Sequence, residues 1–354
     1  MQSDEQVNQI KQEGNIAVID IGISTQQIVV LNPYKPKEPH SYQRLYFPLT
    51  KLKHDLDKHF KSLFRLYADY RIRKFIISIS AAPVFSSARD AVETILNIIN
   101  QYISPQRVLC FSNDAQFVSV SEAKTNPTRV ISTGWRSLGE VLGELVENDA
   151  LIIEFSTRTT QIIPIKEGKI VSSSVSNYDR VRNGELLFYG FLETNISHIQ
   201  NKFEFNNEVF FLPYELHAKV ADILLITEDI QPYQYICDTP DERFKTKEEA
   251  INRLKKVLNI TDPSYDEQKL KIIAEVFKSH LLDQIEIQIK TKLAEYNLQN
   301  VVITGLGASI LCQHLESKGL NAKIIEAVDK LPNTEICPAY CIAYLYSKKL
   351  ISNG

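Results

Sequence analysis

Two stretches of the chain repeat one pattern of apolar and polar positions. In Asn15–Leu31 an apolar run leads into Asp20, small and hydroxyl residues follow, and a returning strand runs from Gln27 through four apolar residues to Leu31. In Leu151–Ile165 the first apolar run ends at Glu154, and hydroxyl residues separate it from the second run. Apolar runs on both sides of a short turn predict β-hairpins. The repetition indicates a duplicated architecture, and two unrelated hairpins are the alternative.

The remaining apolar spacing predicts an alternation of helices and strands. Helices are expected at 52–70, 84–102, 246–259, 266–296 and 338–347, with helical segments within 121–146. Strands are expected at 42–49, 74–80, 107–111, 169–173, 300–304 and 323–326. Residues 210–226 are also expected to be helical, which would place Glu215 and Asp222 on one helix face. These two carboxylates would then hold a cation together, or form an ordinary polar face.

The two hairpin turns carry groups that suit an anion and a divalent cation. Gly22, Ser24 and Thr25 follow the first acid, and a turn of four hydroxyl residues and one arginine follows the second. Backbone N–H groups and hydroxyls in tight turns bind anionic oxygens, while carboxylates at strand ends bind hydrated cations. Because Ser and Thr are also common turn residues, ordinary hairpin turns are the alternative.

Two further segments contain candidate binding residues. Gly305 and Gly307 stand between a predicted strand and a predicted helix, where nucleotides and other anions meet a helix N-terminus. Glycines there also serve close packing. The segment 178–186 mixes arginines, carboxylates and a glycine. Its arginines would clamp a phosphate or carboxylate, or would form weak surface salt bridges.

The composition argues against several classes of protein. The net charge of -3 and the absence of a basic run argue against nucleic-acid binding. No apolar stretch reaches the length of a membrane span, and the polar N-terminus does not resemble a signal peptide. The five cysteines include no CxxC pair, so reduced, buried thiols are expected rather than a zinc site. We therefore expect a cytoplasmic protein without nucleic-acid or membrane partners.

The order of these motifs resembles the actin, Hsp70 and sugar-kinase superfamily. Within it, the chain resembles the archaeal branch of the hydantoinase A/oxoprolinase-like family that includes methanofuran-biosynthesis synthases. The residues that carry the closer resemblance are Tyr46–Leu49, Ile162–Ile165, Asp179–Leu186, Tyr189–Gly190, Glu215, Ala218, Asp222, Arg253–Leu254 and Gly305–Gly307.

The resemblance implies an α/β fold of two actin/Hsp70-like (ribonuclease H-like) domains with a central cleft. The expected boundaries are a flexible N-terminus at 1–14, a first domain at 15–150, a second at 151–330 and a C-terminal helix at 331–354 that packs back on the first. In that family two hairpin turns hold phosphates and a late glycine turn holds adenosine. The implied ligands are Mg²⁺ and either ATP or a small-molecule substrate that bears a diphosphate. The resemblance does not decide whether the protein forms a homo-oligomer.

The implied site residues fall into three groups. The catalytic group is Asp20, Glu154, Arg180 and Arg182, of which Asp20 and Glu154 would hold the metal. The phosphate- and nucleotide-binding group is Gly22, Ser24, Thr25, Thr157, Arg158, Thr159, Thr160, Gly305 and Gly307. The substrate-binding group is Asp179, Gly184, Glu185, Glu215 and Asp222.

Both hairpin turns also depart from the family pattern. Ile23 replaces a second glycine, Gln27 stands where the family has a lysine, and Gln161 stands where it has a trailing aspartate. A lost lysine removes a point charge from a phosphate site. Two hypotheses follow: an enzyme that acts on a phosphorylated substrate, which we favour, and a relative without catalysis that binds a ligand or a protein.

Overall fold

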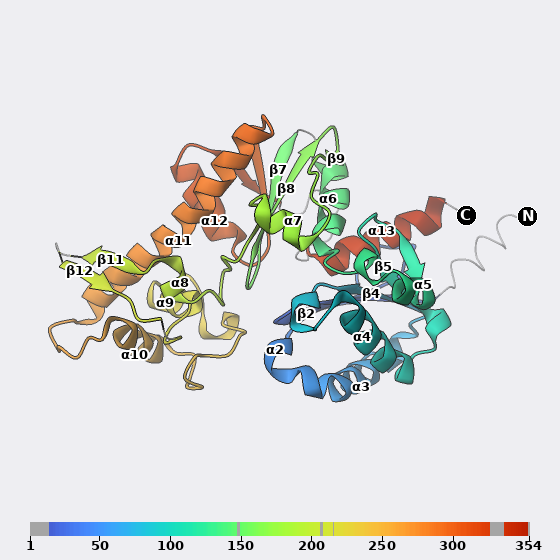
Figure 1. Cartoon of the computed structure of the whole chain (residues 1–354), viewed down its shortest axis with the longest axis horizontal. Helices are drawn as coiled ribbons and strands as arrows, with labels where there is room; N and C mark the ends of the chain where they lie inside the picture. The colour runs from blue at the N-terminus through green and yellow to red at the C-terminus, as the bar shows by residue number, and fades with distance from the viewer. Residues whose placement is uncertain (1–13, 147–148, 206–207, 215, 326–335, 353–354) are drawn as a thin grey trace, which may run out of the picture. The chain divides into compact units, whose positions relative to one another are not determined.

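The computed structural model describes residues 14–146, 149–205, 208–214, 216–325 and 336–352. The chain divides into two compact units (Figure 1). Unit 1 consists of Met1–Asn148, Ile165–Asn177 and Ile325–Gly354, and unit 2 of Asp149–Pro164 and Tyr178–Ile324. Each unit is built on its own β-sheet.

The sheet of unit 1 has the strand order β3-β2-β1-β4-β5-β6. These strands are β1 (Ile16–Ile21), β2 (Thr25–Leu31), β3 (Ser41–Tyr46), β4 (Lys74–Ile79), β5 (Val108–Phe111) and β6 (Phe117–Ser119). The β1–β2 hairpin is antiparallel, whereas β4 lies parallel to both β1 and β5. Every residue of β1 is buried, as expected for a central strand covered on both faces.

Helices cover unit 1 through apolar stripes and local caps. They are α2 (Leu49–Leu52), α3 (Leu56–Leu66), α4 (Ala88–Tyr102), α5 (Val120–Thr125), α6 (Gly134–Leu145) and α13 (Pro338–Ser352). Ser87 begins α4 by accepting a hydrogen bond from the N–H of Asp90 at 3.1 Å. The buried side chains of α3 and α4 share one core with alternate residues of β1 and β4, such as Ile19 and Ile77. Helix α13 contacts α6, β1 and β2, so the C-terminal segment belongs to unit 1 (Figure 1).

The sheet of unit 2 repeats this order as β10-β8-β7-β13-β14, with β9 paired to β8. Its strands are β7 (Ala150–Phe155), β8 (Thr160–Lys166), β9 (Lys169–Ile170), β10 (Leu186–Leu187), β13 (Asn300–Thr304) and β14 (Asn321–Ile324). Strand β13 lies parallel to β7 and β14, as β4 does to β1 and β5. The repeated order confirms the expected pair of actin/Hsp70-like, ribonuclease H-like units.

The rest of unit 2 is mostly helical. Its helices are α7 (Asn177–Arg182), α8 (Ile196–Ile199), α9 (Val220–Ile226), α10 (Lys247–Leu258), α11 (Glu267–Glu295) and α12 (Ala308–Ser317). Strands β11 (Lys202–Phe205) and β12 (Glu208–Phe211) form a separate hairpin. Thr246 begins α10 by accepting from the N–H of Glu249, as its sequence predicts.

A buried ion pair joins α9 to α10. The Nε atom of Arg253 and one of its terminal nitrogens each lie 2.8 Å from Oδ1 of Asp222, and both side chains are fully buried. A second terminal nitrogen donates to Asp241 at 3.0 Å. The other oxygen of Asp222 accepts from the N–H of Lys219 at 2.9 Å and caps α9. The carboxylate of Asp222 therefore holds α9 against α10 and caps α9.

Several expected elements differ from the observed ones. Residues 210–226 do not form one helix, because residues up to Phe211 belong to β12 and α9 begins only at Val220. Glu215 lies outside the described residues, so its expected place on one helix face with Asp222 stays a prediction. The helix expected at 52–70 is reduced to α3, flanked by short helical turns. Residues 165–177, expected in the second domain, are counted with unit 1, where β9 packs on α6.

Two expectations from the composition concern the whole chain. All five cysteines are buried thiols, as expected, and burial raises the pKa of Cys110 and of Cys237 to about 12. Among the described residues, no helix combines the length and the apolar character needed to cross a bilayer.

Substitution of Asp222 tests the buried ion pair. We expect Asp222→Ala to lower the free energy of unfolding by about 3–5 kcal/mol, because Arg253 would remain charged and buried without its main partner. Urea unfolding followed by circular dichroism measures this change.

The matched control is the exposed pair between Lys348 and Glu144, whose atoms lie 2.6 Å apart. Glu144→Gln should change the unfolding free energy by less than about 1 kcal/mol, since exposed pairs contribute little. Equal effects of the two substitutions would show that burial does not set the strength of the Asp222 pair.

Candidate functional site

A row of polar side chains crosses the unit 1 sheet at the level of Asp20. Asp20 on β1 pairs with Gln27 on β2 and with Ser78 on β4, and Gln27 pairs with Arg44 on β3. Residues that pair directly across neighbouring strands project from the same sheet face. Arg44, Gln27, Asp20 and Ser78 therefore form one continuous row, which we call the unit 1 row.

Hydroxyl groups hold the buried carboxyl group of Asp20. Ser78 Oγ donates to its Oδ1 at 2.6 Å, and Ser80 Oγ donates to the same oxygen at 3.2 Å. Ser78 also lies 3.2 Å from the hydroxyl of Thr133, which precedes α6. Burial raises the pKa of Asp20 above its ordinary value, while the serine hydroxyls and the charge of Arg44 act in the opposite direction. The protein thus keeps an acid in a position that disfavours its charged form.

The turn after Asp20 is closed by a backbone hydrogen bond. The N–H of Gly22 donates to the carbonyl of Thr25 at 3.0 Å, and a Cβ at position 22 would lie 2.6 Å from that oxygen. The carbonyl groups of Ile23 and Ser24 accept from the N–H groups of Leu49 and Phe47. The turn is therefore rigid, and Gly22 is needed for its close approach rather than for an unusual φ.

Unit 2 contains the counterpart of this arrangement. Glu154 on β7 is buried and pairs with Thr304 on β13, as Asp20 pairs with Ser78 on β4. In both units an acid near the end of the first strand thus neighbours a hydroxyl residue on the adjacent parallel strand. The carboxyl ends of parallel strands are the usual location of ligand sites in such sheets.

The hairpin turn at 156–159 is held from one side by the loop after β10. The N–H of Ser156 donates to the carbonyl of Thr159 at 3.0 Å, and the carbonyl of Ser156 accepts from Phe191 at 2.8 Å. A Cβ at Gly190 would lie 2.2–2.6 Å from the backbone of Arg158, so only glycine allows this contact. The hydroxyl of Thr160 donates to the carbonyl of Tyr189 at 2.7 Å, which directs it into the protein.

The hydroxyl of Thr157 differs from that of Thr160. Thr157 is 2% exposed, and its Oγ1 has no hydrogen-bond partner among the described residues. Leaving a buried hydroxyl unpaired costs about 1–3 kcal/mol, and a ligand oxygen or a water bound there would remove this cost. Arg158 next to it is exposed, and Thr159 is half-buried. The turn thus presents one buried hydroxyl and one exposed cation.

The glycine turn after β13 packs against the same hairpin. Gly305 adopts a φ of +95°, and a Cβ there would lie 2.7 Å from the carbonyl oxygen of Phe155. The N–H of Gly307 donates to that oxygen at 3.0 Å. A Cβ at Gly307 would meet the rings of Phe155 and Phe191. Close packing thus explains both glycines, and the structure brings them together with the turn after Glu154.

Arg180 is the buried centre of the segment 178–186. Its guanidinium donates to the side chain of Gln161, to the carbonyl of Glu185 at 2.9 Å and to the carbonyl of Ile162 at 3.2 Å. Burial lowers the pKa of Arg180 to about 10, while the carboxylates of Glu185 and Glu154 act to raise it. The side chain of Gln161 is therefore paired with Arg180.

The other residues of this segment separate into buried and exposed positions. Glu185 is buried and accepts from the hydroxyl of Tyr296 at 2.9 Å, and Gly184 has a φ of +64°. Arg182 and Asp179 lie nearer the surface, and their charged atoms are 3.9 Å apart. The segment is thus mainly a structural support for β8 and β10, with Arg182 as its exposed cation.

The predicted residues therefore form two groups, one in each unit. Unit 1 brings together Asp20, Gly22, Ser24 and Thr25. Unit 2 brings together Glu154, Thr157, Arg158, Thr159, Thr160, Gly305 and Gly307, with Arg180 and Glu185 behind them. Asp222 does not belong to this second group, because Arg253 and the cap of α9 occupy both of its oxygens.

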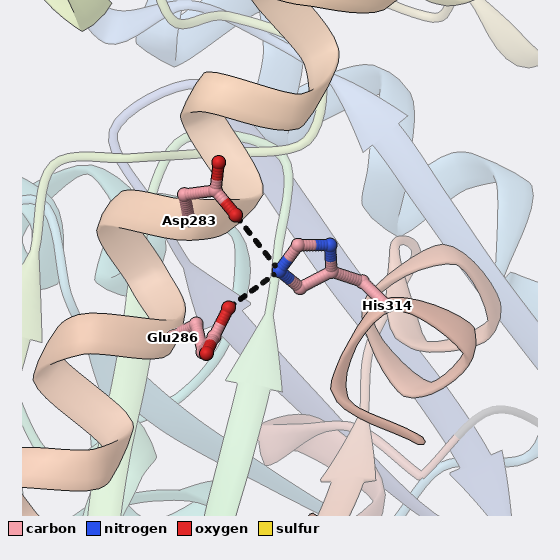
Figure 2. A group of neighbouring side chains, drawn as sticks. All are labelled: Asp283, Glu286 and His314. Atoms are coloured by element: carbon pink, nitrogen blue, oxygen red, sulfur yellow. Dashed lines mark hydrogen bonds and ion pairs between the residues drawn. The ribbon is translucent and has the colours of Figure 1, made fainter. Parts of the chain in front are cut away.

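A cluster that the sequence analysis missed joins α11 to α12. Nε2 of His314 lies 2.9 Å from Glu286 and 3.5 Å from Asp283 (Figure 2). The three residues offer ligand atoms within 4.8 Å of one another. However, Lys318 lies 3.1 Å from Asp283 and Lys290 lies 2.6 Å from Glu286, so lysines already balance the carboxylates. We interpret the cluster as an ion-pair network; only its i, i+3 spacing on α11 was visible in the sequence.

The sequence of this chain is similar to a protein family and to individual known proteins. Residues 76–331 match the family model described as hydantoinase/oxoprolinase. A (4-{4-[2-(gamma-L-glutamylamino)ethyl]phenoxymethyl}furan-2-yl)methanamine synthase of Methanocaldococcus jannaschii is 29% identical over 332 residues, which cover 94% of this chain and 97% of the relative. A synthase of the same name from Methanococcus vannielii is 34% identical over 174 residues, 49% of this chain and 77% of the relative.

Solved structures with related folds are more distant in sequence. The ethanolamine utilization protein EutJ from Carboxydothermus hydrogenoformans is 13% identical with a TM-score of 0.47, over 94% of this chain and 90% of that one. The activator of the 2-hydroxyisocaproyl-CoA dehydratase from Clostridium difficile is 9% identical with a TM-score of 0.45, over 96% and 98% of the two chains. The fold assignment therefore rests on the strand order of the two units.

Replacement of Asp20 tests the cost of its burial. An acid whose pKa is raised in the folded state loses stability as the pH rises from its ordinary pKa of 3.8 through the raised value. Asparagine keeps the size of the side chain without the charge. We therefore expect Asp20→Asn, measured without divalent cations, to raise the melting temperature at pH 7 and to flatten its dependence above about pH 4.

The control for Asp20 is Asp69→Asn, which removes an exposed carboxylate of the same unit. That substitution should leave the melting temperature within about 1 °C of the wild type. A lower melting temperature for Asp20→Asn at pH 7 would contradict the prediction, since the hydrogen bonds from Ser78 and Ser80 would then outweigh the burial cost.

Proposed function

The chain belongs to the hydantoinase/oxoprolinase family, and on this premise we propose that it is a synthase that binds a diphosphate-bearing substrate with Mg²⁺. The hairpin turn at 156–160 would contact the diphosphate, with Glu154 of the same unit as a candidate metal ligand, and Asp20 is the equivalent candidate in unit 1. The observation that carries the proposal is the buried hydroxyl of Thr157, which has no partner among the described residues. A phosphate oxygen would satisfy it.

The name of the relative from Methanocaldococcus jannaschii describes a product with a phenoxymethyl-furan linkage, which is an aryl ether. Such an ether forms when a phenol oxygen attacks the methylene carbon of a furanylmethyl diphosphate. The new C–O bond replaces the bond to diphosphate, which leaves with the electron pair, and the phenolic proton passes to a base or to water. We propose a condensation of this class for the present chain.

The groups around the second hairpin suit a departing diphosphate. Thr157 supplies a hydroxyl donor, and the exposed guanidinium of Arg158 supplies a positive charge on the same turn. Preorganised donors of this kind stabilise negative charge as it develops on a leaving group.

The buried acid of each unit fits a hydrated Mg²⁺. This cation binds through one or two carboxylates and substrate phosphates and keeps several waters. Asp20 and Glu154 are buried carboxyl groups near hydroxyl residues, which agrees with that donor set. When bound, the ion would neutralise charge on the diphosphate. Arg180, behind Glu154, is a positioning residue because its guanidinium donates to β8 and to the backbone of Glu185.

A second candidate function is a binding protein without catalysis. Two changes favour it: Ile23 occupies the position of a family glycine, and Gln27 replaces a lysine. The buried Oε1 of Gln27 has no hydrogen-bond partner among the described residues, so this position still offers an acceptor for a ligand donor. This alternative predicts ligand binding without consumption of diphosphate esters.

Ligand-dependent melting tests the proposed binding. Diphosphate or ATP at 100 times its Kd, with Mg²⁺, would stabilise the folded chain by about 2.7 kcal/mol and raise its melting temperature by several degrees. We expect Thr157→Val to weaken diphosphate binding about tenfold, because one hydrogen bond to a charged group is lost. Glu154→Gln should remove most of the dependence on Mg²⁺.

The matched control is Thr291→Val, which removes an exposed hydroxyl on α11. It should leave both effects unchanged. An absence of stabilisation with every one of these ligands would sink the binding proposal. Binding without release of diphosphate from furanylmethyl diphosphate and a phenol acceptor would favour the protein without catalysis.

A further inference from the structure

A cavity lies within unit 1, at the opposite end of the sheet from Asp20. This cavity has a volume of about 450 Å³, which is within the range of small-molecule sites. Its lining comes from α3, the turn that follows it, the start of β4 and the end of α4. The lining residues are Lys61, Phe64, Arg65, Tyr67, Ala68, Ile72, Phe75, Tyr102, Ile103 and Arg107.

The register of the sheet separates this cavity from the unit 1 row. Phe75 pairs with Ala17 and Val108 near the amino ends of their strands, whereas Asp20 pairs with Ser78 near the carboxyl ends. Three residues of strand, from position 75 to 78, span about 10 Å. The cavity is therefore distinct from the unit 1 row.

The inner wall of the cavity is aromatic and aliphatic. The rings of Phe64 and Phe75 meet edge to face with centroids 5.4 Å apart, and the ring of Tyr102 lies 6.0 Å from that of Phe64. Ile72 and Ile103 are buried beside them. Such a wall favours a flat apolar group, because aromatic rings pack well edge to face and in offset stacks.

The outer lining carries three cations and no carboxylate. Lys61, Arg65 and Arg107 are exposed, and none of them pairs with a carboxylate in the part of the chain that the structure describes. Arg107 donates to the backbone carbonyls of Ile72 and Arg73. The neighbouring Lys58, by contrast, lies 3.0 Å from Asp55. The nearby Asp57 accepts from the hydroxyl of Tyr102 at 2.8 Å and is not part of the lining.

From these observations we propose that this cavity binds a small aromatic carboxylate. The ring of the ligand packs on Phe64, Phe75 and the isoleucines, while its carboxylate binds to the cations of Lys61 and Arg65 at the opening. Guanidinium and ammonium groups without acidic partners attract an anion and bind it through charge-assisted hydrogen bonds. An uncharged aromatic compound lacks the charge-assisted hydrogen bonds to Lys61 and Arg65. A protonated aromatic amine is repelled by their positive charges.

Isothermal titration calorimetry with the full chain tests this site, with 2-naphthoate as the probe and 2-naphthamide as its uncharged analogue. We expect naphthoate to bind with a Kd between about 10 μM and 1 mM, as its size allows. The amide should bind at least about tenfold more weakly, since it keeps the rings but loses the charge.

Two variants locate the bound probe. Lys61→Gln combined with Arg65→Gln should weaken naphthoate binding about tenfold or more and leave amide binding unchanged. Ala68→Trp, at an exposed position of the lining, should fill the cavity and abolish the binding of both compounds without lowering the melting temperature. The matched control Lys58→Gln removes one positive charge from the same helix outside the lining, and it should bind naphthoate like the wild type.

Equal affinities for naphthoate and naphthamide would overturn the proposal, as would naphthoate binding that survives both variants. The control Glu154→Gln keeps this outcome apart from the diphosphate proposal. It should abolish the Mg²⁺-dependent stabilisation by diphosphate while naphthoate binding persists. A loss of naphthoate binding in Glu154→Gln would place the probe in the other site and would also overturn the proposal.

Discussion

Burial of a carboxyl group near the end of a central strand is the constraint on which both halves of this protein depend. Asp20 and Glu154 occupy equivalent positions in two sheets with the same strand order, and each pairs with a hydroxyl residue on the next parallel strand. Removing a charge from water is costly unless hydrogen bonds compensate for it. In unit 1 two serine hydroxyls provide such bonds, yet the pKa of Asp20 is still raised. In the proposed function, a bound metal ion and a phosphate would compensate further for the burial of this charge.

Backbone contacts, more than side-chain charges, hold the second hairpin in shape. The loop at Gly190 rests against Arg158, the glycines at 305 and 307 rest against Phe155, and Arg180 fixes β8 to the backbone of Glu185. A side chain at any of the three glycines would clash with its neighbour. Loss of the Arg180 guanidinium would remove its hydrogen bonds to the carbonyls of Ile162 and Glu185. The turn is thus preorganised, and the hydroxyl of Thr157 within it is buried without a hydrogen-bond partner among the described residues.

The two ends of the unit 1 sheet have different chemistry. The carboxyl ends of the strands carry the unit 1 row, with an acid as its central charged group, whereas the amino ends border an aromatic cavity with three cations. The ligands that we propose for the two ends are accordingly opposite in charge, a divalent cation at one end and an organic anion at the other. Two ligands of this kind would occupy separate sites on one rigid sheet.

The sequence by itself determined the duplicated hairpins, most helices, the cap at Thr246 and the family, because these depend on residues close together in the chain. It misplaced the helix at 210–226, where residues of high helical periodicity instead form β12 and a loop before α9. It also predicted a catalytic role for Arg180 and a substrate-binding role for Asp222, and both roles stay predictions. Only the tertiary structure showed that both side chains are buried, since the partners Gln161 and Arg253 lie 19 and 31 positions away. Burial and pairing depend on contacts between distant segments, and apolar periodicity does not encode them.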